Sequence, residues 1–283
     1  MKSTPISPNN IKNQYIIEAR KGWRIIDLHE LYQYRDLFWF FVWRDIKVLY
    51  KQTVLGFLWA IIRPVFSMII FSVVFGRLAK IPSDGVPYPV FTYVALIPWT
   101  YFSTSFTNSA QSLVANANMI TKVYFPRLVV PMTPVLAGLV DFVISFGILA
   151  VLMAWYGIAP SVYVLFLPAL IFVMMLTAAG TGMWLSAMAI QFRDVRHAMS
   201  FLVQLLMYSA PVVWPVSLIP DKYRLLYGLY PMVGVIEGFR STLLGSRPMP
   251  WDLITVGAVS ASCIALSGAF YFCRMERIFA DVA

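Results

Sequence analysis

The chain has 283 residues, of which 60% are hydrophobic, 16% aromatic and only 12% charged, and its mean hydropathy is +0.73. Soluble domains usually carry about 25% charged residues, so this composition excludes a soluble enzyme and indicates an integral membrane protein. Basic residues outnumber acidic ones by 22 to 13. In a membrane protein this excess points to topology and anionic lipid, and we expect no nucleic-acid partner.

The chain begins with a polar extension over 1–27, which lacks the short apolar core of a cleavable signal peptide. Over 28–52 polar side chains recur every three or four residues beside an aromatic run. This pattern predicts an amphipathic helix at the cytosolic membrane interface, in contact with lipids. The alternative is a first membrane span, which we reject because Asp36, Arg44 and Lys47 would each cost about 2.5–3.5 kcal/mol at the bilayer centre.

The remaining residues, 53–283, are expected to form one all-α transmembrane domain with six spans, because runs of about 18 or more apolar residues predict membrane helices. The spans are 54–76, 89–109, 131–156, 163–190, 199–216 and 253–272. Fifteen Lys and Arg lie in the N-terminal segment and the connections on its side, against six in the other connections. The positive-inside rule therefore places both termini in the cytoplasm.

The first span carries Arg63, and an ionisable residue inside a span is a functional candidate by default. Pro64 follows it and is expected to kink the helix about halfway along. In one interpretation Arg63 lines a polar pathway, in a stripe with Trp59 and Phe66. In the other it pairs with Asp141 of the third span and holds two helices together. The sequence leaves both interpretations open.

The fifth span combines amphipathic side chains with two prolines. Gln204 and Tyr208 are one helical turn apart, and Trp214 lies between Pro211 and Pro215, which are expected to bend the span. Rings with polar tips bind sugar faces, so Gln204, Tyr208 and Trp214 are candidates for a substrate pathway. The alternative is a belt of Tyr and Trp at the outer membrane interface.

Residues 225–245 are apolar but are interrupted by glycines and Pro231, and they carry Glu237 and Arg240. A seventh full span here would move the basic C-terminal residues to the outside. We therefore predict a re-entrant pair of helices before the last span, with Tyr230, Pro231, Glu237 and Arg240 in it. Such a pair requires protein around its irregular backbone.

Patterns for catalysis are missing from the sequence. No glycine is followed by lysine, so the chain has no Walker A loop and is not expected to hydrolyse ATP. The histidines, His29 and His197, have no Cys, His or acidic cluster around them, and Cys263 and Cys273 have no metal-ligand spacing. We expect no catalytic residue, metal site or cofactor in this chain.

Five blocks resemble, in order, the type-2 (ABC-2) permease subunits of ABC exporters for O-antigen, capsular polysaccharide and teichoic acid. The blocks are WRDIKVLYKQTVLGFLW at 43–59, ITKVYFPR at 120–127, FRDV at 192–195, VIEGFR at 235–240 and ERIFAD at 276–281. In two places the chain departs from that family's pattern, since Arg63 often has an uncharged amide counterpart and Tyr230 is usually Asn.

The resemblance implies a homodimeric permease in the bacterial inner membrane that exports a lipid-linked polysaccharide of O-antigen type. Two copies of a separate ABC ATPase subunit would drive it and bind the ATP and Mg. It further implies contacts with that ATPase from the interfacial helix, from a short coupling helix after the second span and from the start of the fifth span. The corresponding residues are Arg44, Lys47, Asn116, Asn118, Lys122, Arg193 and Asp194.

Several alternatives remain. Within the same fold, the cargo could be capsular polysaccharide, teichoic acid, a drug or a small lipid. A membrane-embedded transferase is disfavoured because it would need an acidic or histidine constellation that the sequence does not provide. A proton-coupled transporter would need more intramembrane acidic residues than Asp141.

Overall fold

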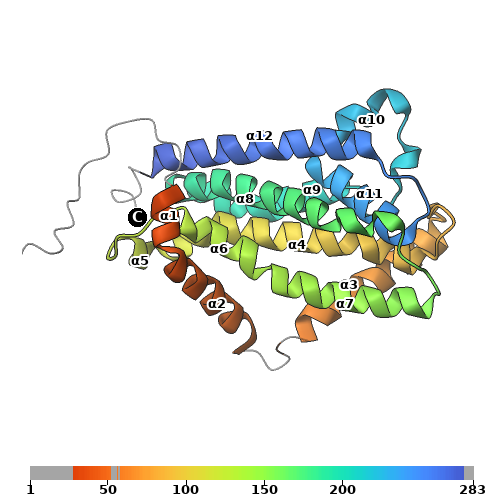
Figure 1. Cartoon of the computed structure of the whole chain (residues 1–283), viewed down its shortest axis with the longest axis horizontal. Coiled ribbons are helices and arrows are strands. Elements are labelled where there is room, and N and C mark those ends of the chain that lie inside the picture. Colours follow the sequence, from red (N-terminus) through yellow and green to blue (C-terminus); the bar gives the residue numbers. More distant parts are fainter. Residues whose placement is uncertain (1–27, 52–55, 57, 277–283) are drawn as a thin grey trace, which may run out of the picture.

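The structure, a computed structural model, describes residues 28–51, 56 and 58–276. Every regular element within these residues is a helix, as the sequence predicted, and the helices run largely side by side (Figure 1). In chain order they are α1 (Leu28–Gln33), α2 (Arg35–Lys51), α3 (Leu58–Phe71), η2 (Ser72–Leu78), α4 (Tyr88–Ala115), α5 (Ala117–Ile120), α6 (Val129–Ala137), α7 (Leu139–Trp155), η3 (Val162–Phe166), α8 (Leu167–Gln191), α9 (Arg193–Ser209), η4 (Val216–Leu218), α10 (Asp221–Gly228), α11 (Pro231–Leu244) and α12 (Trp251–Met275). The polar extension 1–27 lies outside the described residues.

The expected interfacial helix consists of two helices, α1 and α2, which are separated by a turn at Tyr34. The side chains of its aromatic run lie partly inside the bundle and partly on the surface. Phe41 and Val42 are buried against the bundle, whereas Trp39, Phe40 and Trp43 are exposed. The helix is therefore amphipathic, as expected.

Four stretches of the described chain are long and apolar enough to cross a membrane: Leu58–Leu78, Val129–Trp155, Val162–Gln191 and Trp251–Met275. They correspond to the first, third, fourth and sixth predicted spans. The second predicted span is α4, which is long but rich in Ser and Thr. The fifth is α9, which has 17 residues and ends at Ser209. Pro211 and Pro215 thus follow that helix and do not bend it, which corrects the prediction.

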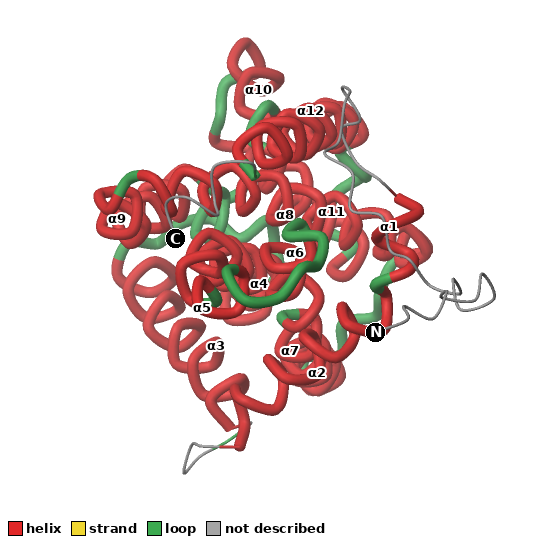
Figure 2. Tube along the Cα trace, turned by 90° about the vertical axis from the view of Figure 1, so that its left-hand side faces the viewer, coloured by secondary structure: helices red, strands yellow, loops and turns green. Residues whose placement is uncertain are grey.

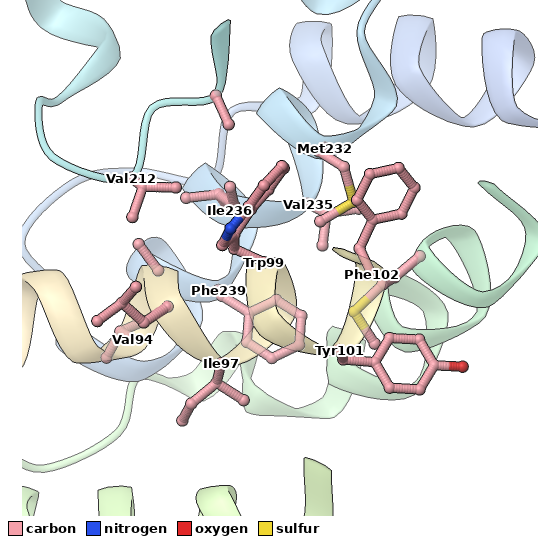
Figure 3. Packing of buried hydrophobic residues seen from close by; sticks show 14 of the residues in the cluster. Val94, Ile97, Trp99, Tyr101, Phe102, Val212, Met232, Val235, Ile236 and Phe239 are labelled. Carbon is pink, nitrogen blue, oxygen red and sulfur yellow. The ribbon is translucent and has the colours of Figure 1, made fainter. Parts of the chain in front are cut away.

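Helix α4 lies at the centre of the bundle when the molecule is viewed along its long axis (Figure 2). Its residues from Val90 to Trp99 are all buried, and they include Tyr93 and Val94, which have no exposed surface. Ile97, Trp99 and Phe102 of α4 belong to the main core cluster together with Ile236 and Phe239 of α11 (Figure 3). Helix α4 therefore lies largely inside the bundle although it is rich in Ser and Thr.

The third predicted span is made of two successive helices, α6 and α7, which meet at Gly138. The hydroxyl of Tyr101 in α4 donates a hydrogen bond of 2.7 Å to the carbonyl of Val135, just before the junction. A Cβ on Gly138 would lie 2.7 Å from the hydroxyl oxygen of Ser105. The glycine therefore permits α4 to approach the junction closely.

Small residues also bring α8 and α12 together. A Cβ on Gly180 would lie 2.7 Å from the Cα of Ala265, and a Cβ on Gly268 would lie 2.4 Å from the carbonyl oxygen of Gly180. Backbones that approach this closely pack well without large side chains between them, which is how membrane helices commonly associate.

Helix α1, the start of α2 and the end of α12 lie at one end of the bundle, which we call the α2 end (Figure 1). There Phe41 of α2, Phe125 of the loop after α5 and Phe272 of α12 share a second core cluster. The guanidinium of Arg127 also donates a hydrogen bond of 2.6 Å to the backbone oxygen of Glu276. The opposite end, which carries α10 and the loop between α11 and α12, is called the α10 end.

Helices α10 and α11 occupy the region expected to be a re-entrant pair. Every residue of α11 is buried, and the helix stops at Gly245, whose φ of 62° suits glycine. Helix α10, in contrast, is mostly exposed and protrudes from the bundle (Figure 1). The shielding by protein that the prediction requires is therefore present around α11.

Candidate functional site

Helix α3 presents one exposed stripe, which contains Trp59, Arg63, Phe66 and Ile70. The guanidinium carbon of Arg63 lies 5.5 Å from the centroid of the Trp59 ring, within the range of a cation–π contact. Pro64 points to the other side of the helix and is buried. Arg63 is the sixth residue of the apolar stretch Leu58–Leu78, so it lies in the first third of that stretch and not halfway along the span as predicted.

Arg63 does not pair with Asp141 in the part of the chain that the structure describes. The carboxylate of Asp141 instead accepts a hydrogen bond from the hydroxyl of Tyr50, at the end of α2. Within the described residues, Arg63 and Asp141 therefore do not form the helix-joining ion pair of the second interpretation. No sequence pattern identified Tyr50 as the partner of Asp141, because the two residues are 91 positions apart.

Helix α9 also has an exposed face, on which Gln204 and Tyr208 lie together with Phe201 and Leu205. Figure 2 shows that α3 and α9 run along the same side of the bundle. Trp214 is half-buried and lies beyond the end of α9, so it does not continue the exposed face. The two helices that carry Arg63, Gln204 and Tyr208 thus lie on one side of the bundle, whereas Trp214 lies in the segment after α9.

The residues expected to contact an ATPase gather at the α2 end. The guanidinium of Arg44 lies 2.8 Å from Asp45 and 3.3 Å from the side-chain oxygen of Asn116. The Asn116 amide also donates a hydrogen bond of 2.8 Å to the carbonyl of Ser112. Arg44 and Asn116 therefore join α2 to the chain between α4 and α5.

The other coupling candidates are exposed: Lys47, Asn118, Lys122, Arg193 and Asp194. The ammonium of Lys47 lies 5.1 Å from the Trp43 ring centroid. Arg193 and Asp194 open α9, and within the described chain they form no ion pair with each other. Both side chains are exposed at the start of that helix.

The α10 end contains a buried ion pair. Glu237 and Arg240, one turn apart in α11, are separated by 2.7 Å, and their side chains are 8% and 4% exposed. Tyr230 and Pro231 precede them, with Pro231 at the first position of α11 and the Tyr230 hydroxyl 3.5 Å from the carbonyl of Leu206. The pair belongs to the core and not to an exposed surface.

Sequence reasoning missed a second polar contact at this end. Asp84, which adopts a positive φ of 51°, forms an ion pair of 2.9 Å with Arg247 and accepts a hydrogen bond from Ser217. Ser217 lies in η4 and Arg247 in the loop after α11, both far from Asp84 in the sequence, so no local spacing could have revealed them. A group of three or more His, Cys, Asp or Glu able to hold a metal does not occur among the described residues.

Comparison with known proteins identifies the family of the chain. Residues 36–244 match the family described as ABC-2 type transporter. The chain is 31% identical over 254 residues to the O-antigen export system permease protein RfbA of Myxococcus xanthus, covering 88% of this chain and 96% of that protein. It is 26% identical to the RfbA protein of Klebsiella pneumoniae, covering 84% and 92%. It is 24% identical to the polysialic acid transport protein KpsM of Escherichia coli, covering 71% and 78%.

The family match spans most of the described helices, from the start of α2 to the end of α11, and the resemblance noted in the sequence is confirmed by it. The chain belongs to the ABC-2 type transporter family.

Proposed function

We propose that this chain is the permease subunit of an ABC exporter that moves a lipid-linked polysaccharide of O-antigen type across the bacterial inner membrane. The observation that carries the proposal is the 31% identity to an O-antigen export permease over 96% of that protein's length. A second relative, named for polysialic acid transport, is also a polysaccharide transporter, which favours a long polymer over a drug or small lipid.

In this proposal the chain crosses the membrane six times, with α4 and α9 added to the four long apolar stretches. At 1.5 Å per residue the 28 residues of α4 would reach about 42 Å, more than the roughly 30 Å of the hydrocarbon core. The 17 residues of α9 would reach about 25 Å, and the chain after Ser209 would complete that crossing. Helix α11, at about 21 Å, is too short to cross and would be re-entrant with α10.

The α2 end would face the cytoplasm, because basic residues are concentrated there and cytoplasmic loops are rich in Lys and Arg. Both termini would then be cytoplasmic. The exposed aromatic residues of α2 would lie at headgroup level, next to anionic lipid.

Two copies of the chain would form the permease, with α3 and α9 of each copy lining the pathway between them. The exposed residues Arg63, Gln204 and Tyr208 favour this arrangement, since a guanidinium in contact with hydrocarbon is costly whereas polar cargo would accept it. A guanidinium also binds phosphate or carboxylate groups, which a lipid pyrophosphate or an acidic sugar would offer. Trp59 and Phe66 would provide the aromatic wall, and Trp214 would lie near its α10 end.

Energy would come from two copies of a cytosolic ABC ATPase, which would bind ATP and Mg. The exposed residues Asn118, Lys122, Arg193 and Asp194 would meet that subunit directly. Arg44 and Asn116, which contact each other, would transmit the contact to α2.

Deletion of the gene in its host tests the proposed cargo. We expect loss of a surface polysaccharide together with accumulation of its lipid-linked form inside the cell, both reversed by the wild-type gene. A deletion strain with normal surface polysaccharide but altered drug resistance would instead support the small-molecule exporter.

Cysteine labelling in a variant without native cysteines tests the topology. We expect Cys at positions 83 and 246 to react with an impermeant maleimide added outside, and Cys at positions 3, 116 and 283 to react only after the membrane is opened. Labelling of position 283 from outside would contradict the six-span arrangement.

A further inference from the structure

The chain between α9 and α10, residues 210–220, forms no α-helix, yet much of it is buried. We call it the α9–α10 linker. Val212 has no exposed surface and Val213 is 6% exposed. Buried backbone outside a helix must find partners for its polar groups, and water is not available inside a membrane domain. The linker's carbonyl groups therefore need donors from other elements.

Two side chains from other helices provide those donors. The guanidinium of Arg240 donates through Nη2 to the carbonyl of Val212 at 2.9 Å and through Nη1 to the carbonyl of Trp214 at 3.2 Å. The hydroxyl of Tyr88, at the start of α4, donates to the carbonyl of Val213 at 2.7 Å. Three successive carbonyl groups of the linker are thus held by α4 and α11.

Arg240 is itself fixed in position. Glu237 lies 2.7 Å from Nη1, and the ring centroid of Phe91 lies 3.7 Å from the guanidinium carbon. Glu237 also accepts a hydrogen bond of 3.3 Å from the backbone N–H of Val216. The carboxylate of Glu237 therefore neutralises the buried cation and also binds the linker at Val216, two residues after Trp214.

We propose that Glu237 and Arg240 are positioning residues, which hold the α9–α10 linker and Trp214 in a single conformation at the α10 end of the permease. The fork of the guanidinium is required, because one side chain has to reach two carbonyl groups and a carboxylate at once. The location of Trp214 beside a transport pathway rests on the function proposed above. The fixation of Trp214 by Arg240 does not depend on that function.

Maleimide labelling of the linker tests this proposal. The probe is Cys at position 213, in the full chain with Cys263→Ser and Cys273→Ser, reconstituted in lipid nanodiscs so that both faces are accessible. Val213 is buried, so we expect slow labelling with Glu237 and Arg240 intact. Arg240→Lys keeps the charge but loses the fork, and we expect labelling to become about tenfold faster, the change expected for one lost charge-assisted hydrogen bond. Glu237→Gln should act in the same direction.

The matched control is Arg224→Gln, which breaks the ion pair of Arg224 with Asp252 at the same end without touching the linker. Its labelling rate should equal that of the parent. Melting temperatures are measured on every variant, so that faster labelling caused by general unfolding is recognised. Labelling rates for Arg240→Lys and Glu237→Gln equal to that of the parent would overturn the proposal.

A charge exchange, Glu237→Arg with Arg240→Glu, separates positioning from simple ion pairing. The exchanged pair keeps both charges, but a carboxylate at position 240 cannot donate to the carbonyl groups of Val212 and Trp214. We expect labelling to stay fast, and a return to the slow parent rate would overturn the proposal. If the exchanged variant does not fold, the labelling rates of Arg240→Lys and Glu237→Gln decide whether the proposal holds. Labelling requires no cargo, so failure of the polysaccharide assay alone leaves this test intact.

Discussion

The hydroxyl of Tyr50 donates a hydrogen bond to the carboxylate of Asp141, which ties the last turn of α2 to the first turn of α7. Burial raises the pKa of Tyr50 above its ordinary value of 10.0, and the bond to Asp141 raises it further. The hydroxyl therefore keeps its proton, and with it the bond, throughout the neutral range.

Replacing this hydroxyl should weaken the attachment of α2. For Tyr50→Phe we expect a loss of about 1.5–3 kcal/mol in unfolding free energy, because the hydrogen bond involves a charged group. The folded-state pKa of Tyr50 is raised, so its contribution is complete below the unfolded pKa and falls only as the pH rises beyond it. The loss should consequently be constant between about pH 6 and 9. Denaturation in detergent measures it, with Tyr163→Phe at the exposed η3 helix as control, and equal losses in both variants would contradict the prediction.

Arg63 and Asp141 should behave as independent residues. Arg63 is exposed and pairs with Trp59, so Arg63→Gln should change stability by no more than about 0.5 kcal/mol while reducing surface polysaccharide. Asp141→Asn should destabilise the protein, and the double variant should show the sum of the two effects. Thermal stability and surface glycan are measured on all three. Recovery of stability in the double variant would reveal an ion pair between the two side chains.

The contact between α8 and α12 should not tolerate a methyl group. Gly180→Ala would place a Cβ 2.7 Å from the backbone of Ala265, so we expect a destabilisation of about 1–3 kcal/mol. Gly147 in α7 is the matched control, since nothing lies within 4 Å of its added Cβ. Gly147→Ala should be neutral or stabilising by up to about 1 kcal/mol. Similar melting temperatures for the two variants would mean that α8 and α12 are not in backbone contact.

The residues at the α2 end should separate into structural and partner-binding ones. Asn116 accepts a hydrogen bond from Arg44, so Asn116→Ala should lower the melting temperature. Asn118 and Lys122 are exposed, and their alanine variants should keep the parent stability but uncouple ATP hydrolysis from export. Crosslinks from Cys at positions 118 and 122 to the ATPase would establish the contact. Crosslinks to lipid alone would assign this segment to the membrane surface.

The apolar runs predicted the helices well, because membrane spans are recognised by local composition. The break at Pro231 and the end at Gly245 were also visible, since both residues impose backbone geometry. The end of α9 was not visible in the sequence, because the apolar run continues beyond Ser209 into the linker. Composition alone cannot distinguish a buried irregular segment from a helix when side chains of other elements satisfy its carbonyl groups.

The candidate site was predicted less completely than the fold. Exposed residues such as Arg63 and Tyr208 stood out because they are unusual in an apolar span. The Tyr50 partner of Asp141 and the carbonyl partners of Arg240 did not, because they lie 91 and up to 28 positions away and are determined by tertiary packing. In the sequence, Tyr50 and Tyr88 cannot be distinguished from ordinary interfacial tyrosines. Their hydrogen bonds to Asp141 and Val213 are seen only in the structure.

The enclosure of α4 has a consequence for the assembly of this protein in the membrane. Its buried hydroxyl side chains, among them Thr92, Ser105 and Ser109, make a lone α4 a poor partner for lipid. The apolar stretches on either side can enter the bilayer by themselves, whereas α4 gains its favourable surroundings only from its neighbours. In the six-span arrangement proposed above, we therefore expect insertion of α4 to be completed late, after the chain through α8 and α11 has been synthesised and the bundle can close around it.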